Sequence, residues 1–138
     1  MGLDMYLLKG NKKVDTKSRA FEEACSWKEA GLTEIGYWRK VNSVHNWFVD
    51  NVQAGEDDCD YYPVEREQLL ELLGICKEVK ENPDLASELL PTCDGFFFGS
   101  TKYDEWYFQD IEETIQILNT VLENTDFENE KIIYTSSW

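Results

Sequence analysis

Residues 37–48 gather side chains of the kinds that recognise anions and planar rings. The segment holds Arg39, Lys40, two asparagines, two tryptophans and His45, which is the only histidine of the protein. A guanidinium group can bind a phosphate through two parallel hydrogen bonds, and a lysine adds a point charge. Aromatic faces stack on nucleotide bases. The pattern predicts a site for a phosphate-bearing or nucleotide-like small molecule.

The spacing within this segment predicts a helix over residues 38–53. Apolar side chains and the histidine recur at three- and four-residue steps: Trp38, Val41, Val44, His45, Phe48 and Val52. In such a helix Arg39 and Lys40 occupy the first turn, where unpaired backbone N–H groups and the helix dipole already favour an anion. Asn42 lies beside them, at the edge of the apolar stripe.

A second stretch, Gly99-Ser100-Thr101, leads into a helix that is expected to open with a capping box over residues 101–104 and to run to about residue 124. Backbone N–H groups and two hydroxyls converge there, as in anion sites at helix N-termini. The two stretches together give the predicted ligand-binding residues: Tyr37, Trp38, Arg39, Lys40, Asn42, His45, Ser100 and Thr101. The sequence assigns no catalytic residue, no metal ligand and no cofactor.

Each of these positions also has a purely structural interpretation. Trp38 can be a core anchor, Arg39 can pair with Glu34 or another carboxylate, and His45 can be a satisfied buried histidine on the apolar stripe. Ser100 and Thr101 can simply cap a helix. The case for a site therefore depends on so many recognition-type residues falling within twelve positions.

Composition limits the classes of partner. A chain of 138 residues with 42% hydrophobic residues indicates one globular domain over residues 1–138. The net charge of −15 disfavours direct binding to nucleic acid, because the phosphate backbone is repelled. Residues 1–54 carry eight Lys and Arg against seven Asp and Glu, whereas residues 55–138 carry five against twenty-one. An anionic small molecule is expected to meet the first part, and a basic host protein the second.

The compartment is expected to be the cytoplasm. The four cysteines form no Cys-x-x-Cys pair, and one histidine cannot complete a usual zinc set, so reduced thiols are expected. Asp4 stands where a secretory signal would need an apolar run, and no apolar stretch is long enough to span a membrane. The oligomeric state is left open.

The predicted fold class is α+β: a single compact domain in which three to five helices pack on a small antiparallel sheet. Strands are expected at residues 3–8, 33–37 and 131–138, with the first paired to the last. Helices are expected at residues 18–30, 38–53, 63–82, 82–90 and 101–124, where Pro63 suits a first helical turn. Residues 94–99 are expected to form a buried extended segment.

Motifs spread over almost the whole chain resemble a widespread family of small bacteriophage and prophage proteins of uncharacterised activity. They comprise the opening MGLDMYL, then EIGYWRK with Asn42, His45 and Trp47-Phe48, Asp58-Cys59, LPT at 90–92, GFFFGST at 95–101, YDE at 103–105 and the terminal SSW. The resemblance implies a phage-like origin and one compact domain. Small phage proteins often act against host machinery or host defence, which suggests sequestration of a defence signal.

Two other functions compete with ligand binding. The acidic residues 55–138 could block a basic host protein by imitating nucleic acid, in which case binding would fall steeply with salt. A hydrolase or transferase centred on His45, with Cys59 or Ser100 as its nucleophile, is the third hypothesis, although neither residue lies in a recognisable nucleophile motif. The residues favour binding over catalysis.

Overall fold

Four antiparallel strands form the centre of the fold, in the spatial order β2-β1-β4-β3. The computed structural model describes residues 2–95 and 99–138. Its strands are β1 (Asp4–Asn11), β2 (Thr33–Arg39), β3 (Tyr62–Val64) and β4 (Glu130–Ser137). With the helices packed around this sheet, the chain is a single compact α+β domain, as the sequence predicts.

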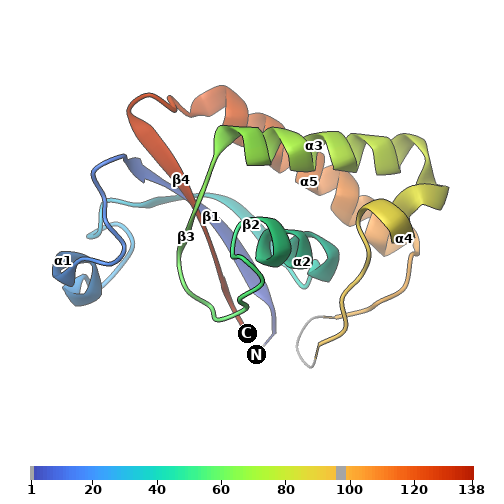
Figure 1. Ribbon diagram of the computed structural model, residues 1–138, viewed down its shortest axis with the longest axis horizontal. Helices are drawn as coiled ribbons and strands as arrows, with labels where there is room; N and C mark the ends of the chain where they lie inside the picture. The colour runs from blue at the N-terminus through green and yellow to red at the C-terminus, as the bar shows by residue number, and fades with distance from the viewer. Residues whose placement is uncertain (1, 96–98) are drawn as a thin grey trace.

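The first and last strands are the two central strands of the sheet. β1 pairs with β4 without interruption, from Asp4 opposite Ser137 to Asn11 opposite Glu130. The two chain ends consequently lie side by side (Figure 1). The predicted pairing of the N- and C-terminal strands is therefore confirmed.

Helices cover the two faces of this sheet unequally. α2 (Asn42–Asn51), α3 (Arg66–Glu81) and α5 (Glu105–Asn124) lie on one side, together with the 3-10 helix η1 (Pro83–Leu85) and α4 (Ala86–Leu89), whereas the short α1 (Arg19–Glu23) lies on the other (Figure 1). Met5, Leu7 and Tyr134 belong to the main core on the α2–α5 side. Leu8 and Ile133 belong to a smaller cluster on the α1 side. Side chains alternate along β1 and β4, so each strand contributes to both cores.

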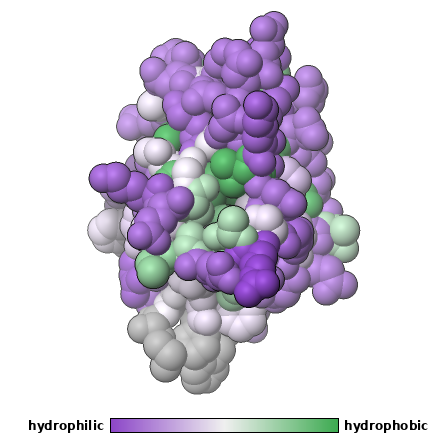
Figure 2. All heavy atoms as spheres, turned by 90° about the vertical axis from the view of Figure 1, so that its left-hand side faces the viewer, coloured by the Kyte–Doolittle hydropathy of each residue, from purple (hydrophilic) through white to green (hydrophobic). Residues whose placement is uncertain are grey.

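Figure 2 views the α1 side, where a small apolar area is surrounded by polar surface. A shallow hollow lined by Phe21, Trp27 and Tyr61 lies on this side of the fold. Among the described residues, no helix has both the length and the apolar character that crossing a lipid bilayer requires.

The predicted helix over residues 38–53 is wrong at its start. β2 continues through Trp38 and Arg39, which pair with Met5 and Asp4, and α2 begins only at Asn42. Trp38 fits the helical stripe because it faces the same core from the strand: its ring lies 6.1 Å from that of Phe48. Periodicity alone cannot separate these two geometries at an element boundary.

Other predicted boundaries also shift. Pro63 lies in β3 at the edge of the sheet, where a missing N–H is tolerated, and α3 begins at Arg66. α1 ends at Glu23, well short of residue 30. The predicted extended segment 94–99 includes residues 96–98, which lie outside the described residues.

The N-cap of α5 is Asp104 rather than Thr101. The carboxylate of Asp104 accepts hydrogen bonds from the backbone N–H groups of Trp106 and Tyr107, at 3.1 and 3.2 Å. A carboxylate satisfies these donors and also complements the positive end of the helix dipole. The predicted capping box over residues 101–104 is therefore wrong, although a helix does follow it.

Asp104→Ala should lower the free energy of unfolding by about 1 kcal/mol, because the cap of the longest helix is lost. Thr101→Ala, at the predicted but unused cap, should change it by less than about 0.5 kcal/mol. Urea unfolding followed by circular dichroism measures both variants. Equal losses in the two would contradict the assignment of the cap to Asp104.

Candidate functional site

Lys40 is the first of the two residues that connect β2 to the start of α2. Its backbone N–H donates to the carbonyl of Leu3 at 2.7 Å, which continues the pairing of the strand. Its φ of 57° then places it in the left-handed region, which non-glycine residues seldom adopt. The chain therefore turns sharply, and α2 starts two residues later.

α2 begins without a side-chain cap. Its N-cap residue, Val41, has no oxygen that could accept from the first turn of the helix. The backbone N–H groups of Ser43 and Val44 belong to that turn, which has no partners within the helix itself. In α5, by contrast, the carboxylate of Asp104 fills this role. The N-terminus of α2, unlike that of α5, thus retains a capacity for an anion.

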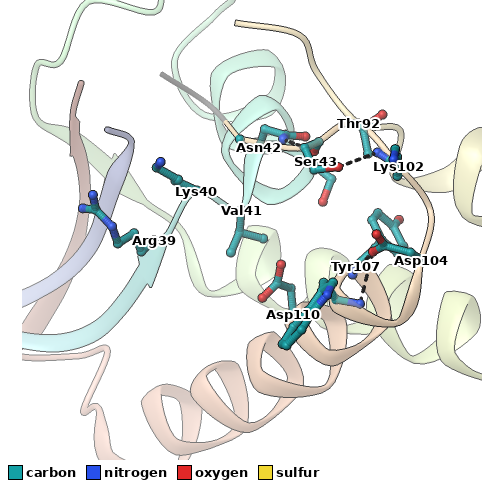
Figure 3. Close-up of a pocket in the computed structure, with 13 residues that line it drawn as sticks. Arg39, Lys40, Val41, Asn42, Ser43, Thr92, Lys102, Asp104, Tyr107 and Asp110 are labelled. Carbon is teal, nitrogen blue, oxygen red and sulfur yellow. Dashed lines mark hydrogen bonds between the residues drawn. The ribbon is translucent and has the colours of Figure 1, made fainter. Parts of the chain in front are cut away.

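A cavity of about 240 Å³ opens at this helix end. Figure 3 shows its walls, which come from the end of β2, the first turn of α2, the segments on either side of residues 96–98, and the first turns of α5. The lining residues are Arg39, Lys40, Val41, Asn42, Ser43, Thr92, Gly99, Ser100, Lys102, Asp104, Trp106, Tyr107 and Asp110.

Arg39 lines this cavity, but its charge is already partnered. Its guanidinium donates to the carboxylate of Asp4 at 2.8 Å. The hydroxyl of Tyr37 donates to the same oxygen at 2.6 Å, and this hydrogen bond, followed by the contact with Arg39, lowers the pKa of Asp4. Arg39 therefore contributes less positive charge to the cavity than its sequence position suggests.

Two lysines supply the remaining positive charge. Lys40 and Lys102 lie on opposite sides of the cavity (Figure 3). Neither has an ion pair with any described residue, whereas Lys9, Lys17 and Lys80 do. Lysine carries its charge on a flexible four-carbon stem, so the ammonium group of Lys40 can adopt positions other than the one in Figure 3, where it points away from Ser43 and Asp110.

Asn42 holds the walls together. Its side-chain amide donates to the carbonyl of Ser100 at 2.8 Å and accepts from the backbone N–H of Cys93 at 2.9 Å. The hydroxyl of Thr92 donates to the carbonyl of Thr101 at 3.0 Å. The two chain segments that flank residues 96–98 are thus joined to each other and to α2. Asn42 positions the cavity wall, and its amide group is used in doing so.

Two polar side chains on the cavity wall have no hydrogen-bond partner among the described residues. Ser43 is 4% exposed, yet its hydroxyl makes no hydrogen bond to residues 2–95 or 99–138. The half-buried carboxyl of Asp110, on the wall opposite Ser43 (Figure 3), likewise has neither a hydrogen bond nor an ion pair within those ranges. Burial, followed by repulsion from Glu113 and Asp104, raises the pKa of Asp110 to about 6.

Larger hollows exist elsewhere, but they lack this combination. A hollow of about 410 Å³ on the α1 side is lined by Phe21, Trp27, Tyr61 and other uncharged residues. Another, of about 470 Å³, lies along the edge strand β3 and mixes exposed Lys, Arg and Glu side chains. Neither contains the first turn of a helix of α2's length without a cap. The cavity at α2 is therefore the candidate site.

The structure brings half of the sequence-predicted ligand residues to this cavity. Arg39, Lys40, Asn42 and Ser100 line it, whereas Tyr37, Trp38, His45 and Thr101 do not. Tyr37 packs beside Tyr6 on the opposite face of the sheet. Trp38 is buried in the core, and its indole N–H donates to Thr114 at 2.9 Å.

His45 is fully buried in a hydrogen-bonded chain of side chains. Its Nε2 lies 3.0 Å from Asp57, and its Nδ1 lies 2.6 Å from the hydroxyl of Tyr134. The indole N–H of Trp138 donates to the same Asp57 oxygen at 3.1 Å. Burial lowers the pKa of His45, so the ring is neutral at pH 7. The neutral ring donates from Nε2 to Asp57 and accepts at Nδ1 from Tyr134.

The thiol that could serve His45 is not activated. Burial raises the pKa of Cys59, so its thiol stays protonated at neutral pH, and a protonated thiol is a poor nucleophile. Both ring nitrogens of His45 form hydrogen bonds in the core. The network therefore links α2, the loop at Asp57 and β4. No chemical step follows from it.

Sequence reasoning missed the contribution of α5 and of residue 43. Ser43 directly follows Asn42, and Asp110 and Thr114 interrupt the apolar stripe of α5 with polar groups. A polar residue on an otherwise apolar helical face was the signal that could have revealed the opposite wall. Lys102 and Trp106 gave no such signal, because exposed charged and aromatic residues occur singly on many surfaces.

Comparisons with known proteins found no match at all: no family model, no curated protein and no solved structure.

Tyr134→Phe should lower the free energy of unfolding by about 1–3 kcal/mol, because a fully buried hydrogen bond to His45 is removed. Tyr62→Phe is the matched control, since its hydroxyl bonds to Asp58 at the exposed surface. It should change stability by less than about 0.5 kcal/mol. Urea unfolding of both variants measures the difference. Equal losses would show that the hydrogen bond between Tyr134 and His45 does not contribute to the free energy of unfolding.

Asp110→Asn should stabilise the protein at pH 7.5, by an amount on the order of 1 kcal/mol given partial solvent screening. The folded-state pKa of about 6 lies above the ordinary aspartate value of 3.8, so the favourable contribution of Asp110 is full below pH 3.8 and is lost as pH rises through about 6. Asparagine stays neutral throughout.

The gain should therefore vanish near pH 4. Unfolding curves from pH 4 to 8 measure it, with Glu113→Gln as the control on the same helix. A constant difference between Asp110→Asn and the unmodified protein at all pH values would contradict the raised pKa of Asp110.

Proposed function

We propose that the protein binds the phosphate group of a small molecule in the cavity at the N-terminus of α2. The observation that carries this proposal is an uncapped helix N-terminus that opens into a cavity beside Lys40 and Lys102. Orphan backbone N–H groups and the positive end of the helix dipole favour an anion, and the two ammonium groups add charge. The unpartnered hydroxyl of Ser43 offers one more donor.

The size of the cavity restricts the ligand. Pockets for drug-sized molecules usually occupy about 300–1,000 Å³. A volume of about 240 Å³ therefore suits a phosphate with a small attached group, and any further part of the ligand has to lie outside. Trp106 lines the cavity while 66% of its surface remains exposed. Its ring is available to stack on a base that projects from the mouth, a contact worth about 1–3 kcal/mol. A mononucleotide matches both constraints.

Parts of several phage-like motifs line this cavity. Arg39, Lys40 and Asn42 belong to one of the stretches that carry the resemblance, and Thr92, Ser100 and Asp104 belong to others. Residues far apart in sequence but joined in one wall are what a shared site would require. On this basis we extend the proposal to a phage-type protein that sequesters a nucleotide used as a host defence signal.

Binding of AMP, GMP and inorganic phosphate, measured by calorimetry and thermal shift, tests the proposal. Saturation at a hundred times the dissociation constant should add about 2.7 kcal/mol of stability. Lys40→Ala and Lys102→Ala should each weaken binding by about tenfold, since a charge-assisted contact contributes about 1.5 kcal/mol.

Lys28→Ala provides the control, because it removes the same charge from an exposed position that does not line the cavity. Its affinity should equal that of the unmodified protein. Absence of binding by all three probes would end the proposal. An equal loss of affinity in Lys28→Ala and Lys40→Ala would show that the weaker binding comes from the change in net charge and not from the position of Lys40.

A further inference from the structure

Asp110 adds a negatively charged group to a cavity that is also lined by two positively charged lysines. Its carboxyl lies on the wall formed by α5, across from the first turn of α2 (Figure 3). Lys40, Lys102 and the backbone N–H groups at the start of α2 are donors, whereas an ionised carboxylate only accepts. A phosphate alone would therefore satisfy one side of the cavity and leave the other without a partner.

The surroundings of Asp110 do not supply that partner. The hydroxyl of Thr114, one turn further along α5, donates to the backbone carbonyl of Asp110 at 2.7 Å rather than to its carboxylate. The hydroxyl of Tyr107 donates to the carbonyl of Leu90 at 2.7 Å. The carboxylate of Asp104 is itself an acceptor and caps α5. Neither Thr114 nor Tyr107 therefore donates to the carboxylate of Asp110.

An isolated half-buried carboxylate is unfavourable unless it is hydrogen-bonded or paired. The hydroxyl of Ser43, a residue that is 4% exposed and lines the cavity, also makes no hydrogen bond to the described residues. Two unpartnered groups on facing walls, one a donor and one an acceptor, indicate a ligand with complementary ends rather than a simple ion.

We propose that the site selects phosphate esters whose other end donates O–H or N–H hydrogen bonds to Asp110. This inference rests on the proposed function and names the ligand class more closely. The hydroxyls of a ribose phosphate and the ammonium group of phosphoethanolamine share this chemistry. Charge-assisted hydrogen bonds to a carboxylate are about twice as strong as neutral ones, so Asp110 contributes mainly to selectivity between esters.

Calorimetry with four probes at pH 7.5 distinguishes phosphate binding alone from selection of the ester through Asp110. Inorganic phosphate and methyl phosphate have the anion without a donor at the far end, whereas ribose 5-phosphate and phosphoethanolamine have both. We expect at least one of the latter pair to bind about tenfold more tightly than methyl phosphate. Asp110→Asn should remove most of this gain and leave the affinity for methyl phosphate within about twofold.

Glu113→Gln makes the same charge change on the same helix outside the cavity lining and should keep the full gain. Equal affinity for all four probes would overturn the inference while leaving phosphate binding intact. Failure of inorganic phosphate and methyl phosphate to bind at all would instead count against the proposed function. A gain that appears only with added Mg²⁺ and disappears with EDTA would also overturn the inference, because a bridging cation would then occupy the place assigned to the donor.

Discussion

The turn at Lys40 is the constraint on which the candidate site depends. Pairing with β1 holds the backbone extended up to this residue, and its left-handed conformation then redirects the chain. Two glycines make room for it: a Cβ at Gly2 would lie 2.9 Å from the Lys40 side chain, and one at Gly99 would lie 3.1 Å from it and 3.2 Å from its carbonyl oxygen. α2 begins two residues after this turn, at Asn42, and its N-cap residue Val41 makes no side-chain hydrogen bond to the first N–H groups of the helix.

The cavity depends on contacts between segments that are distant in sequence. Asn42 joins α2 to the backbone at Cys93 and Ser100, and Trp38 reaches across the core to Thr114 on α5. The wall that carries Asp110 is therefore fixed relative to the wall that carries Lys40. An arrangement of this kind orients a ligand at both ends without any movement of the scaffold.

The sequence could predict the α+β class, the pairing of the terminal strands and four of the cavity residues, because these follow from local periodicity and residue type. It could not place Trp38 in a strand, since Trp38 faces the same core either way. Nor could it show that Arg39 is neutralised by Asp4, which is a partner brought close only by strand pairing. Asp110 was missed for the same reason. Its role depends on the residues that it faces across the cavity, and only the tertiary structure shows which residues these are.

The central pairing of β1 with β4 has a consequence for how the chain acquires its shape. Asp4 pairs with Ser137, so the chain between β1 and β4 must form a loop that includes most of the polypeptide before these two strands can pair. Such distant pairing slows folding, and synthesis delivers β4 after the other three strands. Until β4 is available, β1 has β2 on one side and an open edge on the other, which exposes its apolar residues to other chains. Emerging polypeptides should therefore be most prone to aggregation while β4 is still inside the ribosome.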